Sequence, residues 1–295
     1  RDAIPLLPEH YDEPFADAAN IPLLLMCRSL RGDLKVVLQG DGGDEVFGGY
    51  RRYSLLRFER LWQRIPTVVS RFARRSGALG LRFARIAETM RATDPGVRMA
   101  LLLTTEVPQS PPEEVFSLDR QSNLEESTDP FLEYKRAATR FADYDSVQKM
   151  LLTDLTVQLP SQFLTKVDRA TMAASVEARV PLLDERVMQV AINLPSHWKV
   201  AGAKKKIILR EILRNRLPTS IVEAPKTGFG VPYQHWLRTT LYSFAEERLL
   251  DQSFLTNFSM MPSAVERLLK EHREGVADRG YLLWKLMNLQ LWHSR

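Results

Sequence analysis

Apolar residues recur at helical spacing through most of this chain, from residue 52 nearly to its end. An apolar side chain returns every three to four positions, and Pro, Gly or Asx residues separate the successive segments. The pattern predicts helices over 52–64, 67–75, 79–92, 95–105, 130–142, 147–159, 168–174, 184–193, 204–216, 232–250, 262–274 and 279–292. The apolar stretch 21–30 predicts one more, and the polar segment 109–128 predicts a mobile excursion. We therefore expect a mainly helical body.

The segment 34–39, Leu-Lys-Val-Val-Leu-Gln, is the strongest strand candidate. It is a compact β-branched run that ends at Gly40, and such a run is typical of a buried parallel strand, which we expect to be central in its sheet. A buried strand needs neighbours for its backbone N–H and C=O groups. Other strands are therefore expected in weaker sequence signals or upstream of Arg1.

The composition is that of an ordinary globular domain. With 295 residues, 44% hydrophobic and 26% charged, the chain can bury a large core and differs from disordered, collagenous and coiled-coil proteins. Its single cysteine, Cys27, excludes an internal disulfide and a structural zinc site, and its apolar neighbours favour a core position. No stretch reaches the roughly 18 apolar residues of a membrane span, and no signal-peptide pattern occurs. We expect a cytoplasmic protein with no membrane partner.

Positive charge is concentrated in the first part of the helical body. The net charge is +5, and arginines recur between Arg51 and Arg85 at helical spacing, with Leu, Phe and Trp among them. Such a stripe favours a solvated helix face or the rim of a site for a small anion. A nucleic-acid surface is the alternative interpretation, and we expect no nucleic-acid partner.

The densest group of chemically useful residues directly follows the predicted strand. Residues 39–50, Gln-Gly-Asp-Gly-Gly-Asp-Glu-Val-Phe-Gly-Gly-Tyr, contain five glycines and three carboxylates. At the carboxyl end of a parallel strand, glycine lets backbone N–H groups approach a phosphate, and carboxylates can hold Mg²⁺ or accept a proton. Glu45 breaks a GxGxxG pattern, Val46 breaks an EF-hand pattern, and no Walker or HExxH sequence occurs. A ligand loop is favoured over an acidic turn without a ligand.

Two later segments also combine charge with loop signals. Residues 166–184 alternate acids and bases around a proline, which favours buried ion pairs at a helix-turn-helix corner. Residues 225–232 place Lys226 on a glycine-rich loop. Such a loop can close a cation over an anionic ligand, and a solvated lysine is the alternative for that segment alone.

The three segments follow one another in this order, and a lysine-rich helix precedes the third segment. Together they resemble the synthetase domain of glutamine-dependent asparagine synthetases. The resemblance runs from about Tyr11 to Trp236. It implies an α/β fold with a parallel sheet of the adenine-nucleotide α-hydrolase (ATP pyrophosphatase) type, truncated at its start, and a predominantly helical remainder. Residues 1–295 would form one partial synthetase domain, with the remaining sheet core and ligand loop in 1–50 and the helical body in 51–295.

The resemblance also implies roles for particular residues. The residues assigned to ATP and pyrophosphate are Gln39, Gly40, Asp44, Glu45 and Lys226. Asp44 is the implied metal ligand, with ATP and Mg²⁺ as cofactors. Asp41 holds the acidic position credited with proton transfer and substrate contact, and Lys226 stabilises pyrophosphate and the intermediate. Asp41 and Lys226 are therefore the expected catalytic residues.

The implied reaction is ATP-dependent amide formation. Aspartate is adenylated and then attacked by ammonia, giving asparagine, AMP and pyrophosphate, and the ammonia comes from glutamine in an upstream glutaminase domain of the same polypeptide. Neither that domain nor the family's SGGxDS loop occurs in this sequence, so we expect the chain by itself to be inactive. A homodimer, a relative that amidates or cyclises another carboxylate (a sugar acid, a β-lactam or a peptide precursor), and an inactive binding module stay open.

Overall fold

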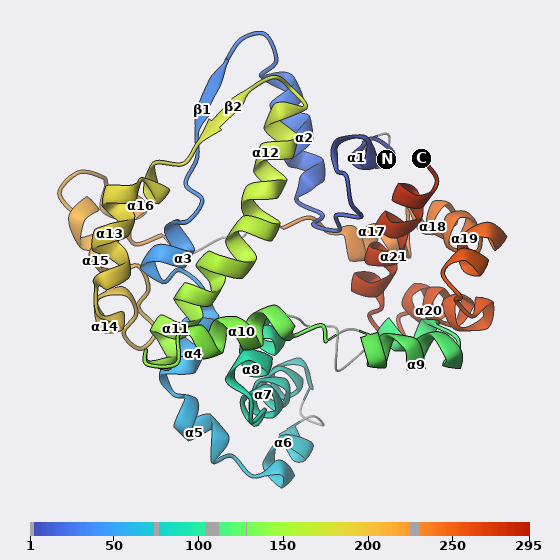
Figure 1. The fold of residues 1–295 in the computed structure, drawn as a ribbon, viewed down its shortest axis with the longest axis horizontal. Coiled ribbons are helices and arrows are strands. Elements are labelled where there is room, and N and C mark those ends of the chain that lie inside the picture. Colours follow the sequence, from blue (N-terminus) through green and yellow to red (C-terminus); the bar gives the residue numbers. More distant parts are fainter. Residues whose placement is uncertain (1–2, 74–76, 104–111, 128, 225–229) are drawn as a thin grey trace.

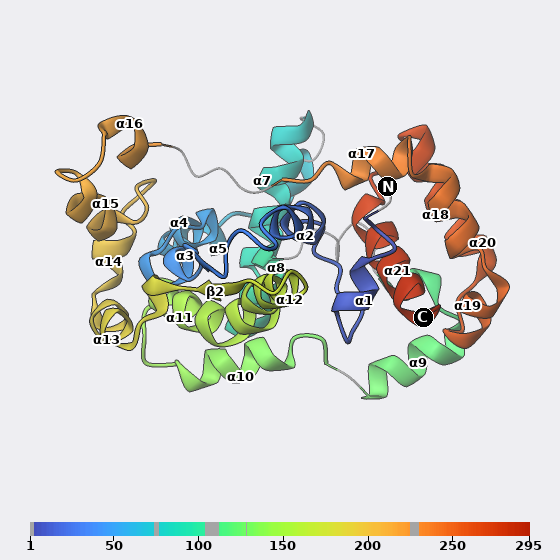
Figure 2. The same ribbon diagram turned by 90° about the horizontal axis from the view of Figure 1, so that it is seen from above.

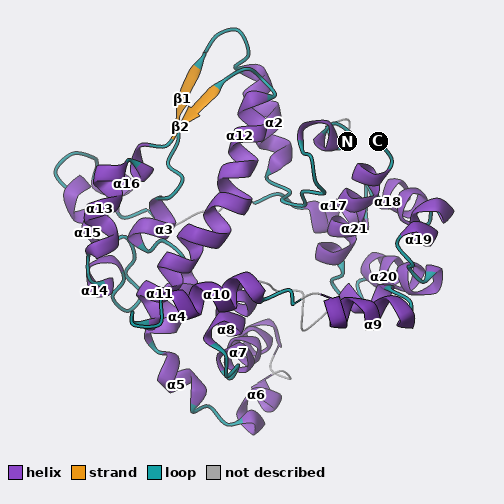
Figure 3. Cartoon of the chain, viewed as in Figure 1, coloured by secondary structure: helices purple, strands orange, loops and turns teal. Residues whose placement is uncertain are grey.

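The computed structural model describes residues 3–73, 77–103, 112–127, 129–224 and 230–295. These residues are mostly helical and carry one small parallel sheet at an end of the molecule (Figure 1), and Figure 3 shows how little of the chain is strand. The predicted combination of a parallel sheet with a mainly helical body is confirmed. No helix within the described ranges is long and apolar enough to cross a membrane.

Short helices make up most of the structure, and Figure 2 shows from above how they spread around the sheet ribbon. The first part of the chain forms α1 (Leu7–His10), α2 (Asn20–Ser29), α3 (Gly43–Phe47), α4 (Arg51–Arg57), α5 (Glu59–Gln63), α6 (Thr67–Ala73), α7 (Gly77–Met90) and α8 (Pro95–Leu103). The middle part forms a 3-10 turn (Pro112–Val115), α9 (Leu118–Ser127), α10 (Leu132–Arg140), α11 (Ser146–Thr153), a π-helical segment (Asp154–Leu164), α12 (Thr165–Met172), a second 3-10 turn (Pro181–Leu183), α13 (Glu185–Asn193), α14 (Ser196–Lys199), α15 (Ile207–Leu213) and α16 (Thr219–Val222). The last part forms α17 (Tyr233–Arg238), α18 (Tyr242–Leu249), α19 (Gln252–Asn257), α20 (Pro262–Glu274) and α21 (Gly280–His293).

The sheet pairs two short strands that are far apart in the sequence. β1 (Val36–Leu38) lies parallel to β2 (Glu177–Arg179), and the Gln39 N–H donates to the carbonyl of Arg179 (2.8 Å). The predicted parallel strand is therefore confirmed, although it is shorter than expected. The predicted helix-turn-helix corner in 166–184 is wrong in its second half, because β2 is extended there to complete the sheet.

One face of this sheet is covered and the other is exposed. Val37 packs with Cys27 of α2 and Ala170 of α12, so Cys27 lies in a core as predicted. Side chains alternate along a strand, and Val36 and Leu38 are accordingly 40% and 73% exposed. The prediction of a buried, central strand is wrong for the described chain, because helices cover the ribbon on one side and β1 has one strand neighbour.

One continuous helical run carries the chain toward the sheet (Figure 1). α11 leads directly into the π-helical segment, and that segment leads into α12. Pro160 lies inside the π-helical segment. Proline has no N–H to donate and its ring crowds the preceding turn of an α-helix, so the wider π turn accommodates it. The helix predicted to stop at residue 159 therefore continues past the proline.

Two hydrophobic clusters hold most of the helices together. In the larger one, helices α17 to α21 pack with α1 and α2 around Trp284, whose indole N–H donates to the carbonyl of Ala16 (2.9 Å). In the second, α4, α8 and α11 meet around the buried side chains of Tyr53, Met99 and Met150. The last fifty residues, which carry no recognisable motif, thus form a core that closes onto the start of the chain.

The segment predicted as a mobile excursion is helical where it is described. Residues 112–127 form a 3-10 turn and α9. Val115 is buried, and its carbonyl accepts from the N–H of Met261 (2.8 Å), while the Ser117 N–H donates to the carbonyl of Ser259 (2.9 Å). These anchors are distant in the sequence and leave no local signal, and the mobility of the segment stays a prediction.

Gly48, at the end of α3, generates a prediction about stability. Its φ of +76° is left-handed, and a Cβ there would lie 2.5 Å from Cγ2 of Val200, a stiff and buried side chain. Gly48→Ala should lower the free energy of unfolding by about 2–4 kcal/mol in urea denaturation. Gly202→Ala is the control and should cost about 1–2 kcal/mol, because Gly202 has a φ of +59° with open space around it. Equal losses would contradict the packing argument.

Candidate active site

The glycine-rich loop leads from β1 into α3, a short helix bounded by two left-handed glycines. Gly42 (φ +79°) precedes α3 and Gly48 (φ +76°) follows it. All residues of α3 are buried, including the carboxylates Asp44 and Glu45. The motif therefore holds its acids inside the protein, which argues against a merely solvated acidic turn.

Packing explains two of the glycines without any ligand. A Cβ on Gly42 would overlap the side chain of Leu183, and a Cβ on Gly49 would overlap the carboxylate of Asp44. The space around Gly40, by contrast, is open. Gly40 therefore leaves room for a phosphate to approach the backbone, as expected, whereas Gly42 and Gly49 are required by internal contacts.

Asp44 forms an ion pair that sequence analysis missed. Its Oδ1 lies 2.9 Å from Nζ of Lys206, and both side chains are mostly buried, at 12% and 25% exposed. Lys206 directly precedes α15 and has a φ of +53°, which is uncommon for a side chain of this size. The only sequence signal was a run of three lysines before an apolar helix, and such a run does not indicate which lysine turns inward.

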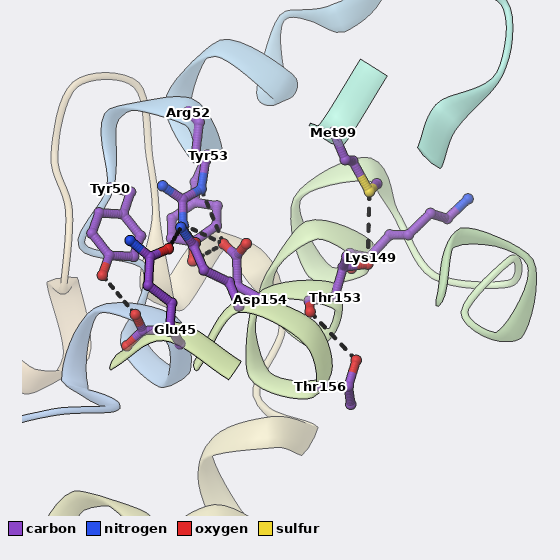
Figure 4. Close-up of polar contacts among 11 residues, drawn as sticks. Glu45, Tyr50, Arg52, Tyr53, Met99, Lys149, Thr153, Asp154 and Thr156 are labelled. Atoms are coloured by element: carbon purple, nitrogen blue, oxygen red, sulfur yellow. Dashed lines mark hydrogen bonds and ion pairs between the residues drawn. The ribbon is translucent and has the colours of Figure 1, made fainter. Parts of the chain in front are cut away.

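Glu45 is hydrogen bonded to the tyrosine that ends the motif. The Tyr50 hydroxyl donates to Oε1 of Glu45 (2.6 Å; Figure 4), and Glu45 is 2% exposed. Burial raises the pKa of Glu45, the hydrogen bond from Tyr50 opposes that shift, and the neighbouring charge of Asp44 adds to it. Glu45 thus acts as a buried acceptor that closes the motif on itself.

Two positions after Tyr50, Arg52 reaches the start of the π-helical segment. Its Nε and Nη2 donate to Oδ2 of Asp154 (3.0 and 2.8 Å), and the Tyr53 hydroxyl donates to the same oxygen (2.5 Å; Figure 4). Asp154 is fully buried, and burial raises its pKa while Arg52 and Tyr53 oppose the shift. The guanidinium also lies 3.9 Å from the centre of the Tyr50 ring. The ion pair therefore positions Tyr50, and through it Glu45.

A row of polar side chains continues from this ion pair along the helical run. Nη2 of Arg52 also donates to Oε1 of Gln158 (2.7 Å), and Nε2 of Gln158 donates to Oε1 of Gln162 (3.2 Å). Gln162 and Lys166 both donate to Oδ2 of Asp17 (3.4 and 2.8 Å). The pair of Lys166 with Asp17 is mostly buried, at 14% and 17% exposed. The prediction of buried ion pairs in 166–184 is otherwise wrong, because Arg169 and Arg179 form their ion pairs at the surface.

A pocket of about 1040 Å³ opens beside this site. Charged residues dominate its lining, and they are Arg51, Arg52, Lys204, Lys205, Arg210, Arg214, Glu211 and Glu223. Gly49 and Tyr50 form part of its wall, and Asp44 lies directly behind Gly49. A predominantly basic lining suits a polyanion such as the phosphates of a nucleotide.

Arg210 connects this pocket to the segment before the predicted lysine loop. Its guanidinium donates to the carbonyls of Val222 and Ala224 at the end of α16. Lys226 follows Ala224 by two positions in the sequence but lies outside the described residues. The expected convergence of Lys226 with the carboxylates in one cleft therefore stays a prediction.

The other predicted site residues lie in the loop before α3. Gly40 is exposed, while Gln39 and Asp41 are partly buried. Within the described ranges, no group of three or more His, Cys, Asp or Glu residues could hold a metal ion. Mg²⁺ commonly uses one or two carboxylates together with substrate phosphates and water. Asp44 and Asp41 fit that limited donor set, and they do not form a metal centre by themselves.

A parallel strand, a glycine-rich loop, a buried acidic helix and a basic pocket lie together here, an arrangement chemically suited to an anionic ligand. The chain belongs to the asparagine synthase family, because the family model described as asparagine synthase matches residues 1–294. The resemblance that the three segments predicted is therefore confirmed.

Individual relatives agree with this assignment. The putative asparagine synthetase (glutamine-hydrolyzing) of Mycobacterium tuberculosis is 32% identical over 308 residues, which cover 99% of this chain and 44% of the relative. Asparagine synthetase (glutamine-hydrolyzing) 1 of Bacillus subtilis is 28% identical over 295 residues, with 99% and 45% covered. Asparagine synthetase B of Escherichia coli is 37% identical over 95 residues, with 31% and 17% covered. The chain spans less than half the length of these relatives.

The raised pKa of Glu45 predicts how stability depends on pH. Below the ordinary pKa of 4.5, Glu45 is protonated in the folded and the unfolded chain alike. As the pH rises, the unfolded chain ionises first, so stability is lost until the pH passes the folded pKa. Glu45→Gln keeps an acceptor for Tyr50 and cannot ionise. We expect the free energy of unfolding of Glu45→Gln, relative to that of wild type, to increase between about pH 4 and pH 8. Both are measured by urea denaturation.

Glu177→Gln is the control for this pH series. Glu177 is exposed, and its hydrogen bond from Arg179 lowers its pKa, so any trend should have the opposite sign and be small. A difference between Glu45→Gln and wild type that stays constant across the pH range would contradict the prediction.

The buried ion pair predicts unequal mutational costs. Asp154→Ala leaves the Arg52 guanidinium buried without its carboxylate and should lower the free energy of unfolding by about 3–5 kcal/mol. Tyr53→Phe removes one hydrogen bond and should cost about 1–2 kcal/mol. Glu133→Ala is the control and should cost about 0.5 kcal/mol or less, because its pair with Arg136 is 64% and 66% exposed. Comparable losses at the buried and the exposed pair, measured in urea, would refute the assignment.

Proposed function

We propose that the protein is an ATP-dependent amidoligase of the asparagine synthetase type, which activates a carboxylate as an acyl-adenylate and transfers ammonia to it. The observation that carries this proposal is the basic pocket of about 1040 Å³ beside the Asp44–Lys206 pair. The names of the relatives support ligase and amidotransferase chemistry in amino-acid biosynthesis as the general class. The finer assignments below concern the whole protein. This chain matches less than half the length of each of these relatives.

The proposal extends to the sheet and the nucleotide. We infer that β1 and β2 belong to a sheet of the adenine-nucleotide α-hydrolase type, with ATP bound where the loop at Gly40 leaves β1. The phosphates would enter the basic pocket, where Arg51 and Lys205 screen their charge. Asp44 would hold Mg²⁺ against the phosphates, and that ion would supply charge neutralisation during transfer.

The proposed chemistry explains why both acids and bases are needed. A carboxylate is a poor electrophile, so adenylation supplies it with a leaving group, and the resulting pyrophosphate needs cations around it. Lys226 is the proposed loop cation for that step. Ammonia that attacks the adenylate must lose a proton, and Asp41 is the proposed acceptor. We propose aspartate as the carboxylate and an upstream glutaminase domain as the source of ammonia.

Asp44 and Asp41 predict two different kinetic defects in the whole protein. Asp44→Asn should lower Mg²⁺- and aspartate-dependent release of pyrophosphate from ATP by about 100-fold or more, because it weakens charge stabilisation of the phosphates. Asp41→Asn should retain more of the pyrophosphate release but lower asparagine formed per pyrophosphate by about 100-fold, since it removes the proton acceptor. Both products are measured in one assay with ammonia or glutamine.

Asp119→Asn is the matched control, because Asp119 is an exposed acid on α9, remote from the loop in sequence. It should leave both products unchanged. The 295-residue chain assayed alone should release no pyrophosphate. Full activity of Asp44→Asn would overturn the site assignment, and absence of pyrophosphate release by the whole protein with every carboxylate offered would overturn the proposed reaction.

A further inference from the structure

Helix α6 turns a polar residue inward and apolar residues outward. Ser70 is fully buried, and its hydroxyl oxygen accepts from Nη2 of Arg91 (2.8 Å). At 100° per residue, Val68 and Phe72 lie on the side of α6 opposite Ser70, and they are 59% and 64% exposed. This reverses the usual amphipathic pattern, in which the apolar side of a surface helix faces the core.

Helix α5 adds arginines to the same end of the molecule. Trp62 faces inward, with its ring centre 5.4 Å from that of Phe83. Arg60 and Arg64 flank Trp62 by two positions on either side, which places them on the opposite side of the helical turn, and both are exposed. The outward sides of α5 and α6 therefore combine guanidinium groups with solvent-exposed apolar side chains.

The described acidic residues do not neutralise the exposed arginines of this surface. Glu59, the one acidic residue of the described α5 and α6 segments, pairs with the largely buried Arg98. No described residue forms an ion pair with Arg60, Arg64 or Arg71. The arginines are thus available to an external anionic partner.

We define the arginine-rich tip as Arg60, Leu61, Arg64, Val68, Arg71 and Phe72. α5 and α6 form the lower end of the molecule in Figure 1, away from the β1–β2 ribbon and from α15, which lines the basic pocket. The arginine-rich tip is therefore distinct from the candidate active site, and the proposed reaction gives it no role.

We propose that the arginine-rich tip docks on the surface of an anionic lipid bilayer. Interfacial helices place Phe and Leu side chains at the boundary of headgroups and acyl chains and surround them with cations. Guanidinium groups bind headgroup phosphates through paired N–H donors. A helix at the lower end of the molecule with exposed apolar residues fits insertion into that boundary better than a flat protein interface. This proposal departs from the sequence-based expectation of no membrane partner, and surface docking requires no spanning segment.

Co-sedimentation with lipid vesicles tests this proposal. The purified protein is mixed with vesicles of phosphatidylcholine alone or with 30% phosphatidylglycerol, in low salt and in 0.5 M NaCl. We expect binding to the anionic vesicles in low salt, with little binding to phosphatidylcholine or in high salt. Val68→Ser with Phe72→Ser should lower the partition coefficient by about tenfold or more. Replacing Arg60, Arg64 and Arg71 by Gln should lower it by about 100-fold.

Matched variants separate the tip from general surface properties. Val190→Ser with Val276→Ser removes apolar residues elsewhere that are at least as exposed, and replacing Arg120, Arg136 and Arg140 by Gln removes the same charge from α9 and α10. The first should leave binding unchanged, and the second should lower it much less than the tip variant. Circular dichroism checks that each variant is folded. Equal effects of tip and control variants, or no binding of wild type to anionic vesicles, would overturn the proposal. Self-association that the Phe72 variant abolishes without lipid would assign the tip to a second copy instead.

Discussion

The buried ion pair of Arg52 with Asp154 is the constraint on which the rest of the structure depends. A fully buried carboxylate is tolerated only with a charged partner and hydrogen-bond donors, and Arg52 and Tyr53 supply them. Arg52 follows the glycine-rich loop directly, while Asp154 begins the π-helical segment. The pair therefore fixes the loop against the helical run that ends in α12, and the chain after α12 supplies β2 to the sheet.

The polar row beyond this pair extends the same constraint toward the start of the chain. Gln158 and Gln162 relay hydrogen bonds along the π-helical segment, and Lys166 binds Asp17 at its far end. Asp17 neighbours Ala16, which accepts the hydrogen bond from Trp284 in the C-terminal core. A chain of part-buried polar contacts thus connects the loop to the residues that pack against the last helices.

Local patterns predicted the parts of the fold that local physics determines. The helical periods and the loop after residues 34–39 were recognisable because apolar spacing and glycine reflect the backbone directly. β2 has the residues Glu-Ala-Arg, which carry no strand signal, and its extended form comes from pairing with β1. The inward turn of Lys206 toward Asp44 is likewise a long-range contact. The sequence does not show whether a lysine is solvated or forms an ion pair, so only the folded structure distinguishes these two states.

The neighbouring carboxylates of α3 illustrate how such contacts divide chemical roles within one motif. Asp44 faces a cation, Lys206, beside a basic pocket, whereas Glu45 faces a phenol, Tyr50, and burial raises its pKa. Glu45 is 2% exposed and its environment disfavours the charged form, whereas Asp44 keeps its charge partner beside the pocket. Of the two carboxylates, Asp44 is therefore the one that lies against the wall of the basic pocket, and Glu45 is the one that holds Tyr50 and the loop in place.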